Sequence, residues 1–155
     1  MKRSHSKLIV DSREKWTQSG DGGRMAAYFS AHCDWTVRKL DVGDYMLEGG
    51  SVTIDRKQDL DELRQNLTNP KDHARFMKEV RRAKEQRLKL IVLCECGGKV
   101  KTIPDVASWQ SKHSPVSGRY LMERIYQTHI SYGVEFLFCD KRSTPRRILE
   151  LLGAE

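Results

Sequence analysis

The segment from Val42 to Asp61 constrains the fold most strongly, because it joins two turn signals to a charged strand end. Gly43-Asp44-Tyr45 indicates one turn and Gly49-Gly50 a second, so the chain around them is predicted to form a β-hairpin. Asp44 lies just before the first strand of this hairpin, and Asp55 lies near the end of the second. A tight antiparallel pairing would therefore bring the two carboxylates together.

Lys57 adds a positive charge to the same place. Side chains repeat every second residue along an extended segment, so Lys57 is expected on the face that carries Asp55. Two carboxylates can hold a divalent metal through hard oxygen ligands, and the ammonium group can orient a water molecule or neutralise a phosphate. The spacing alone leaves a plainer interpretation open, since Asp55-Arg56-Lys57 could be a charged strand edge and Gly43-Asp44 an ordinary turn.

The length and charge of the chain narrow its class. Its 155 residues are predicted to form one domain, spanning residues 1–155, with 32% charged and 38% hydrophobic residues. The formal net charge of +7 favours a polyanionic partner, with nucleic acid preferred over a membrane surface. No apolar run approaches the roughly 18 residues that span a bilayer. We therefore expect a cytoplasmic or nucleoid-associated protein, or a nuclear one in a eukaryote, without a signal peptide. The four cysteines form no disulfide or zinc framework and are expected to be free thiols.

Strand and helix patterns alternate along the chain, which predicts an α/β fold with a mixed central sheet flanked by helices. The apolar run Lys7 to Asp11 ends in a carboxylate, and the run Leu90 to Glu95 does the same. Open α/β sheets place their sites at the carboxyl ends of the strands. Asp11 is therefore a candidate site residue, and Arg13 and Glu14 follow it directly.

The most basic segment runs from Lys71 to Leu88, after the helix-start signal Asn69-Pro70. Its narrow apolar stripe predicts a helix. The cations proposed to contact a nucleic-acid backbone are Arg75, Lys78, Arg81, Arg82 and Lys84. A solvated charged face explains the same pattern. Asp61 has a similar alternative, as a solvent-exposed acid in the first turn of the preceding helix.

Three ordered blocks resemble the signature of the XPF-type nuclease domain, a branch of the PD-(D/E)XK metal-dependent nucleases. They are Ile9 to Glu14, Leu40 to Tyr45, and Ile54 to Asp61. Family members carry Asp-x-Arg-Glu after the first strand, Gly-Asp-Tyr before the hairpin, and Glu-Arg-Lys with Asp soon after. The resemblance is looser over the remaining chain and covers nearly its whole length.

The resemblance implies a restriction-endonuclease-like core, a Mg²⁺ or Mn²⁺ ion, and cleavage of DNA at flaps, forks or junctions in repair and recombination. Asp44 and Asp55 would be direct metal ligands, with the backbone carbonyl of Arg56 a possible third. Lys57 would hold the attacking water or the scissile phosphate. By the same resemblance Asp11, as a further metal ligand, and Arg13 would complete the site, with Glu14 and Asp61 in support.

The sequence departs from the family pattern in two ways. Asp55 stands where family members usually have Glu, and the shorter side chain shifts a bound metal by about one bond length. The chain also has no room for the tandem helix-hairpin-helix domain with which these nucleases grip DNA. We therefore expect a stand-alone module that relies on its own basic surface, on a homodimer or on an accessory loader protein.

Two alternatives to a flap or fork nuclease remain at this stage. One is a non-catalytic DNA-binding or scaffold module of the same fold, against which the intact set of Asp11, Asp44, Asp55 and Lys57 argues. The other is a Holliday-junction resolvase, which would nick four-way junctions symmetrically as a dimer.

Overall fold

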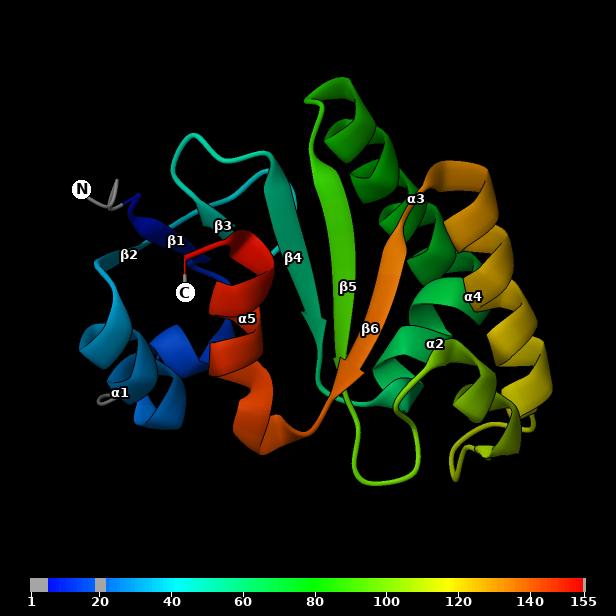
Figure 1. Cartoon of the computed structure of the whole chain (residues 1–155). Coiled ribbons are helices and arrows are strands. Elements are labelled where there is room, and N and C mark those ends of the chain that lie inside the picture. Colours follow the sequence, from blue (N-terminus) through cyan, green and yellow to red (C-terminus); the bar gives the residue numbers. More distant parts are fainter. Residues whose placement is uncertain (1–5, 19–21, 155) are drawn as a thin grey trace.

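The central element of the computed structural model, which describes residues 6–18 and 22–154, is a twisted mixed sheet (Figure 1). Within these residues the sheet has six strands in the order β2-β1-β3-β4-β5-β6. The strands are β1 (Leu8–Asp11), β2 (Trp35–Arg38), β3 (Tyr45–Leu47), β4 (Val52–Lys57), β5 (Lys89–Glu95) and β6 (Glu135–Cys139). The predicted α/β fold with a mixed sheet is confirmed.

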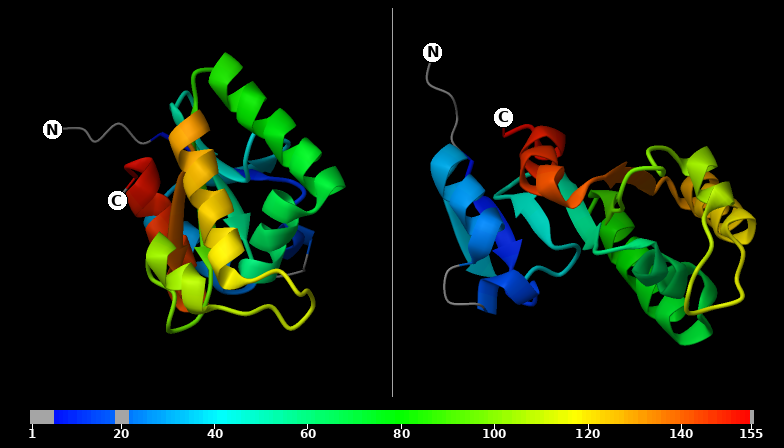
Figure 2. Two further views of the ribbon diagram at one scale, coloured as in Figure 1. Left: turned by 90° about the vertical axis from the view of Figure 1, so that its right-hand side faces the viewer. Right: turned by 90° about the horizontal axis from the view of Figure 1, so that it is seen from below.

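Helices cover both faces of the sheet (Figure 2). One face carries α1 (Gly23–His32) and α5 (Thr144–Leu152), and the other carries α2 (Leu60–Thr68), α3 (Pro70–Glu85) and α4 (Gly118–Tyr132). Short 3₁₀ helices occur at η1 (Lys15–Gln18), η2 (Ile103–Ser108) and η3 (Lys141–Ser143). Each face has its own apolar core. Val92 of β5 packs into the core under α2 to α4, and Leu93 packs into the core under α5, which explains why β5 is a continuous apolar run.

The direction of β3 decides where the functional residues meet. β3 pairs antiparallel with both β1 and β4, whereas β4 and β5 run parallel. The start of β3 therefore lies at the sheet edge where β1 and β4 end. The predicted hairpin is confirmed, with Gly50 N donating to Leu47 O across its turn at 2.9 Å.

Helix starts follow the capping signals of the sequence. The Asp59 side chain accepts from Glu62 N at the start of α2, and the Asn69 side chain accepts from Lys71 N and Asp72 N at the start of α3. Pro70 occupies the first turn of α3, where its missing N–H costs nothing. The Ser117 side chain accepts from Tyr120 N at the start of α4, and the left-handed Gly133 ends this helix.

The end of α3 differs from the prediction. The basic helix was expected to continue to Leu88, but it ends at Glu85, and the prediction is wrong by three residues. Arg87 adopts a left-handed backbone with φ of 57°, Leu88 N donates to Ala83 O, and Arg87 N donates to Lys84 O. This is the Schellman pattern, which normally has glycine at the left-handed position. The sequence shows no glycine there, so it contains no stop signal.

The described residues bear on two further expectations. Within residues 6–18 and 22–154, no helix combines the length and the apolar character needed to cross a membrane. Cys94, Cys96 and Cys139 are free thiols, as predicted.

Arg87 allows a stability prediction. A left-handed L-residue costs roughly 1–2 kcal/mol, and glycine recovers this at an entropic cost of roughly 0.5–1 kcal/mol. Arg87→Gly should therefore raise the free energy of unfolding by about 0.5–1 kcal/mol, measured by urea denaturation. Arg81→Gly, inside the same helix, serves as the control and should destabilise by about 1 kcal/mol. Equal losses in both variants would contradict the assignment of the helix end.

Candidate active site

Asp44 lies between the ends of β1 and β4, and its backbone forms hydrogen bonds with both strands. Its peptide oxygen accepts from Asp11 N at 2.8 Å, and its N–H donates to Ile54 O at 2.6 Å. Its carboxylate Oδ2 accepts from the backbone N–H of Arg56 at 2.8 Å. The preceding residue must be glycine, because Gly43 has φ of 73° and an added Cβ would lie 2.1 Å from Thr53 Oγ1. Backbone contacts thus fix the position of the Asp44 carboxylate.

Asp55 and Lys57 lie on one face of β4, as their alternation predicts. Asp55 is 5% exposed, and its Oδ2 lies 3.1 Å from Lys57 Nζ. Despite this ion pair, Asp55 Oδ2 has no hydrogen-bond partner among the residues that the structure describes. Lys57 Nζ also donates to Asn66 Oδ1 of α2 at 3.1 Å. A buried carboxylate oxygen therefore retains unused capacity to bind a cation.

The electrostatics indicate that these acidic groups interact closely. Burial raises the pKa of Asp44 well above its usual value, and the charges of Asp55 and Glu14 raise it further. Burial lowers the pKa of Lys57, but the neighbouring carboxylates, Asp55 first, outweigh it and the net pKa is raised. The charged form of Lys57 is therefore favoured, beside carboxylates that repel each other.

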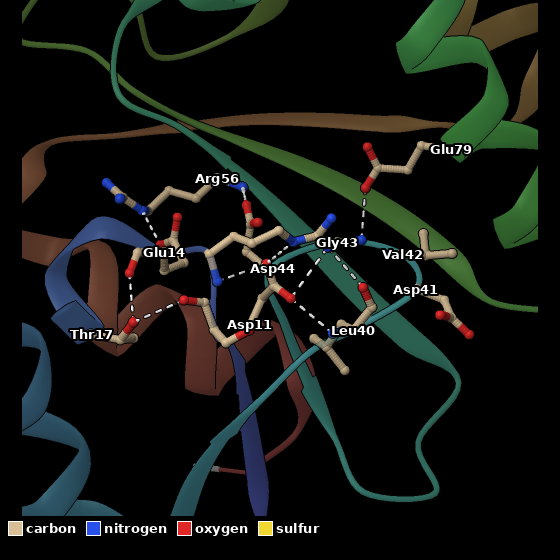
Figure 3. A network of polar contacts seen from close by, with 12 residues as sticks. Asp11, Glu14, Thr17, Leu40, Asp41, Val42, Gly43, Asp44, Arg56 and Glu79 are labelled. Atoms are coloured by element: carbon tan, nitrogen blue, oxygen red, sulfur yellow. Dashed lines mark hydrogen bonds and ion pairs between the residues drawn. The ribbon is translucent and has the colours of Figure 1, made fainter.

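A third acid, which the sequence analysis did not select, reaches this place from α3. Glu79 Oε1 accepts from the N–H of Gly43 at 2.7 Å (Figure 3). Burial raises the pKa of Glu79, and the charge of Asp55 raises it further. The sequence contained one usable signal, because Glu79 precedes Val80 and so borders the buried stripe of an otherwise basic helix.

Asp11 and Arg13 form a support beside Asp44. Asp11 Oδ1 accepts from Leu40 N at 2.8 Å, and its Oδ2 accepts from Arg13 Nε at 2.8 Å. Both oxygens of Asp11 are thus used within the chain. The Arg13 side chain is 61% exposed, and its pKa is raised by the hydrogen bond to Asp11 and also by Asp44 and Glu79. Arg13 therefore presents a positive charge to solvent next to the acidic cluster.

The side chain of Arg56 takes part in a separate network, shared with Glu14. Strand alternation turns it to the face opposite Asp55 and Lys57. There it forms a hydrogen-bonded ion pair with Glu14 at 2.8 Å and another with Glu95. The Tyr45 hydroxyl donates to Glu14 and accepts from Trp16 Nε1. Arg56 thus contributes its backbone N–H to Asp44, while its guanidinium holds the strand end together.

Asp61 lies in another cluster. It contacts Arg64 at 3.0 Å and accepts from the Ser111 hydroxyl, which in turn accepts from His113 N. Burial acts to raise the pKa of Asp61, but these hydrogen bonds outweigh it and the net pKa is lowered. Asp61 thus anchors the segment around Ser111, and among the described residues it shares no hydrogen bond or ion pair with Asp44 or Asp55.

The basic side chains of α3 point in different directions. All five predicted nucleic-acid contacts are exposed: Arg75, Lys78, Arg81, Arg82 and Lys84. With about 100° per residue, Arg75 and Arg82 lie within about 60° of Glu79 around the helix, and Lys78 within about 100°. Arg81 and Lys84 lie about 140–160° away. Arg82 donates to Asp41 O at 3.3 Å, beside the site, whereas Lys84 lines a cavity with Tyr132 of α4.

The acidic cluster fits a divalent cation held by few protein ligands. No group of three His, Cys, Asp or Glu side chains in the described ranges has the geometry to hold a metal by itself. Mg²⁺ is often bound by one or two carboxylates, with water and substrate phosphate oxygens completing the shell. Asp55 Oδ2, which has an ion pair with Lys57 but no hydrogen bond from a described residue, matches this requirement beside the buried Asp44.

The fold and this cluster define a restriction-endonuclease-like domain. The ERCC4 domain family matches residues 10–152, so the chain belongs to that family, the nuclease family that the sequence motifs indicated. No curated protein matched the chain. Two solved structures of XPF from Aeropyrum pernix are similar, each at 19% identity. One has a TM-score of 0.65, covering 95% of this chain and 60% of that chain. The other, a complex with DNA, has a TM-score of 0.67, covering 96% and 64%. The present chain thus spans about three fifths of the XPF chains it matches.

The buried charge of Asp44 predicts an unusual dependence of stability on pH. Because its pKa is raised above the unfolded value of about 3.8, the folded protein binds more protons than the unfolded chain above that pH. Its contribution to stability is therefore lost as pH rises toward the folded pKa. In a chelator, Asp44→Asn should unfold at a higher temperature than wild type, and the difference should grow from pH 4 to pH 7. A difference that is constant or reversed would contradict the assignment.

Proposed function

We propose that the chain is a divalent-metal-dependent endonuclease that hydrolyses phosphodiesters at branched DNA. The observation that supports this best is the buried Asp55 Oδ2, which has no hydrogen-bond partner among the described residues and lies beside Lys57 and near Asp44. A carboxylate with a purely structural role would accept hydrogen bonds at both oxygens, as Asp11 does. Membership of the ERCC4 family and the XPF fold support the same reaction.

Asp44 and Asp55 would hold Mg²⁺ or Mn²⁺, with the carbonyl of Arg56 as a third candidate ligand. The bound ion would supply a Lewis acid and lower the pKa of a coordinated water molecule. Asp11 supports the site through Leu40 and Arg13, because both of its carboxylate oxygens are engaged by them.

Lys57 would act as a fixed positive charge. Although burial lowers its pKa, the neighbouring carboxylates raise it above the usual value, which favours the protonated form that donates hydrogen bonds. Asp55 and Asn66 hold its ammonium group in place. From there Lys57 can orient the attacking water and stabilise the charge that develops on the phosphate. Arg13, exposed beside Asp44, would contact the phosphate from the solvent side.

DNA would lie along the side of α3 that carries Glu79. Arg75, Lys78 and Arg82 share this side with the acidic cluster, so a backbone seated on them reaches Asp44 and Asp55. One of the two similar XPF structures is a complex with DNA, which supports DNA as the partner. Branched substrates, a homodimer and an accessory loader protein are further parts of this proposal, by analogy with the longer XPF chains.

Asp55→Asn tests the reaction directly, because it keeps the size of the side chain and removes its charge. Labelled flaps, forks, four-way junctions and plain duplexes are incubated with Mg²⁺, Mn²⁺ or chelator. Cleavage should fall by at least about 100-fold, the scale on which loss of one electrostatic group acts, while DNA affinity in chelator stays within about twofold. Glu123→Gln, an exposed carboxylate on α4, is the control and should cleave normally. Binding without any cleavage by wild type would favour the non-catalytic module, and symmetric nicking of four-way junctions alone would favour a resolvase.

The two sides of α3 allow a charge-matched test of the DNA path. Arg75→Ala with Arg82→Ala should weaken binding and reduce the slope of log affinity against log salt by about 2, one unit per lost phosphate contact. Arg81→Ala with Lys84→Ala removes the same charge and should change the slope by less than about 0.5. Fluorescence anisotropy over a salt series measures both. Equal slopes in the two double variants would show that binding follows net charge and not this path.

A further inference from the structure

Glu79 is unusual among the acids of α3. Asp72 pairs with Arg75 at the exposed start of the helix, and Glu85 is exposed at its end. Glu79 alone of these three reaches across to another element, where its Oε1 accepts from Gly43 N at 2.7 Å. Its Oε2 has no hydrogen-bond partner among the described residues. The helix proposed to seat DNA therefore also contacts the residue directly before Asp44 (Figure 3).

The segment from Leu40 to Asp44 is fastened from two directions. The sheet holds both ends of this segment. Leu40 N donates to the Asp11 side chain, and the backbone of Asp44 forms hydrogen bonds with the backbone of Asp11 and of Ile54. Thr53 Oγ1 also donates to Val42 O at 2.7 Å. On the other side, α3 holds the middle, through Glu79 on Gly43 N and Arg82 on Asp41 O.

The contact with Glu79 matters because the Gly43 backbone determines where the Asp44 side chain points. The left-handed φ of 73° at Gly43 sets the direction in which the Asp44 carboxylate leaves the chain, and a Cβ added here would meet Thr53 Oγ1 and Ile54 O. A rotation of the Gly43 peptide would move the Asp44 side chain with it. Two hydrogen bonds oppose this rotation, because Val42 O, in the same peptide group as Gly43 N, accepts from Thr53 Oγ1 and Gly43 N donates to Glu79. Glu79 is the one acceptor for that N–H among the described residues.

We propose that Glu79 is a positioning residue: its carboxylate fixes the Gly43 peptide and thereby the aim of Asp44 at the metal site. The effect of Glu79 on catalysis rests on the proposed function, whereas its hydrogen bond to Gly43 does not. In this proposal α3 has two roles. It binds the DNA backbone, and it holds the metal-binding carboxylate of Asp44 in a fixed position relative to that backbone.

The acceptor role and the charge of Glu79 can be separated by substitution. Glu79→Gln keeps an oxygen at the same reach and removes the charge. Glu79→Met keeps the reach and the packing but offers no acceptor for Gly43, and Glu79→Ala is a second variant without an acceptor. Glu85→Gln, the exposed acid on the same helix, is the matched control.

The first readouts need no cleavage. Hydrogen exchange of the Gly43 amide, followed by NMR in chelator, should be at least about tenfold faster in Glu79→Met than in wild type, and close to wild type in Glu79→Gln. Mn²⁺ affinity, measured by calorimetry, should fall about 10–100-fold in Glu79→Met, the range typical for residues that support metal ligands. It should stay within about threefold of wild type in Glu79→Gln and Glu85→Gln. In DNA cleavage kcat should fall with Mn²⁺ affinity, while KM stays unchanged.

Three results would overturn the proposal. One is an unchanged Gly43 exchange rate and Mn²⁺ affinity in Glu79→Met or Glu79→Ala. Another is loss of Mn²⁺ affinity in Glu79→Gln with Gly43 still protected, which would assign the role to the charge. The third is loss of folding in both variants without an acceptor while Glu79→Gln keeps wild-type stability but not Mn²⁺ affinity. A wild-type protein that binds Mn²⁺ yet cleaves no DNA would refute the proposed function alone, because the exchange and affinity results would still stand.

Discussion

The backbone of Asp44 links the two strands that build the site. It receives a hydrogen bond from β1 through Asp11 and donates one to β4 through Ile54. These bonds are possible only because β3 runs antiparallel between two strands that end at the same edge. The side chain of Asp44 is then carried to the point where β4 presents Asp55 and Lys57. Residues that are distant in sequence are thus brought together by the strand order, by the left-handed backbone of Gly43 and by the hydrogen bonds of the Asp44 backbone.

The two faces of β4 have opposite electrostatic characters. On one face Arg56 is satisfied by Glu14 and Glu95, and Tyr45 and Trp16 complete the network. Such a buried, fully paired network holds strand ends in a defined arrangement. On the other face, burial and mutual repulsion raise the pKa values of Asp44 and Glu79, and Asp55 keeps an oxygen without a hydrogen bond from any described residue. A divalent cation would relieve this repulsion, so the unfavourable charges on this face fit a binding site better than a structural role.

The sequence predicted the hairpin, the mixed sheet and the family because the turn glycines and the charged strand end lie close together in the chain. Glu79 and Asn66 were not predicted at the site, because both approach it through the tertiary packing of helices, and the position of Glu79 beside the buried stripe of α3 was the one signal for either. The sequence assigned Arg56 a role only through the family resemblance, as a backbone ligand, and did not predict that its guanidinium pairs with Glu14 and Glu95 on the opposite face of the strand. The end of α3 was missed because Arg87 occupies a position that glycine usually marks. The roles of Asp11, Asp44, Asp55 and Lys57 in catalysis remain predictions.

Anomalous diffraction from a crystal soaked in Mn²⁺ would show whether Asp44 and Asp55 bind the cation, because it locates the ion without reference to activity. We expect a single strong peak between the carboxylates of Asp44 and Asp55, about 2.0–2.3 Å from an oxygen of each, with water completing the shell. A peak held by other residues, or well-ordered Asp44 and Asp55 side chains with no ion between them at saturating Mn²⁺, would contradict this expectation.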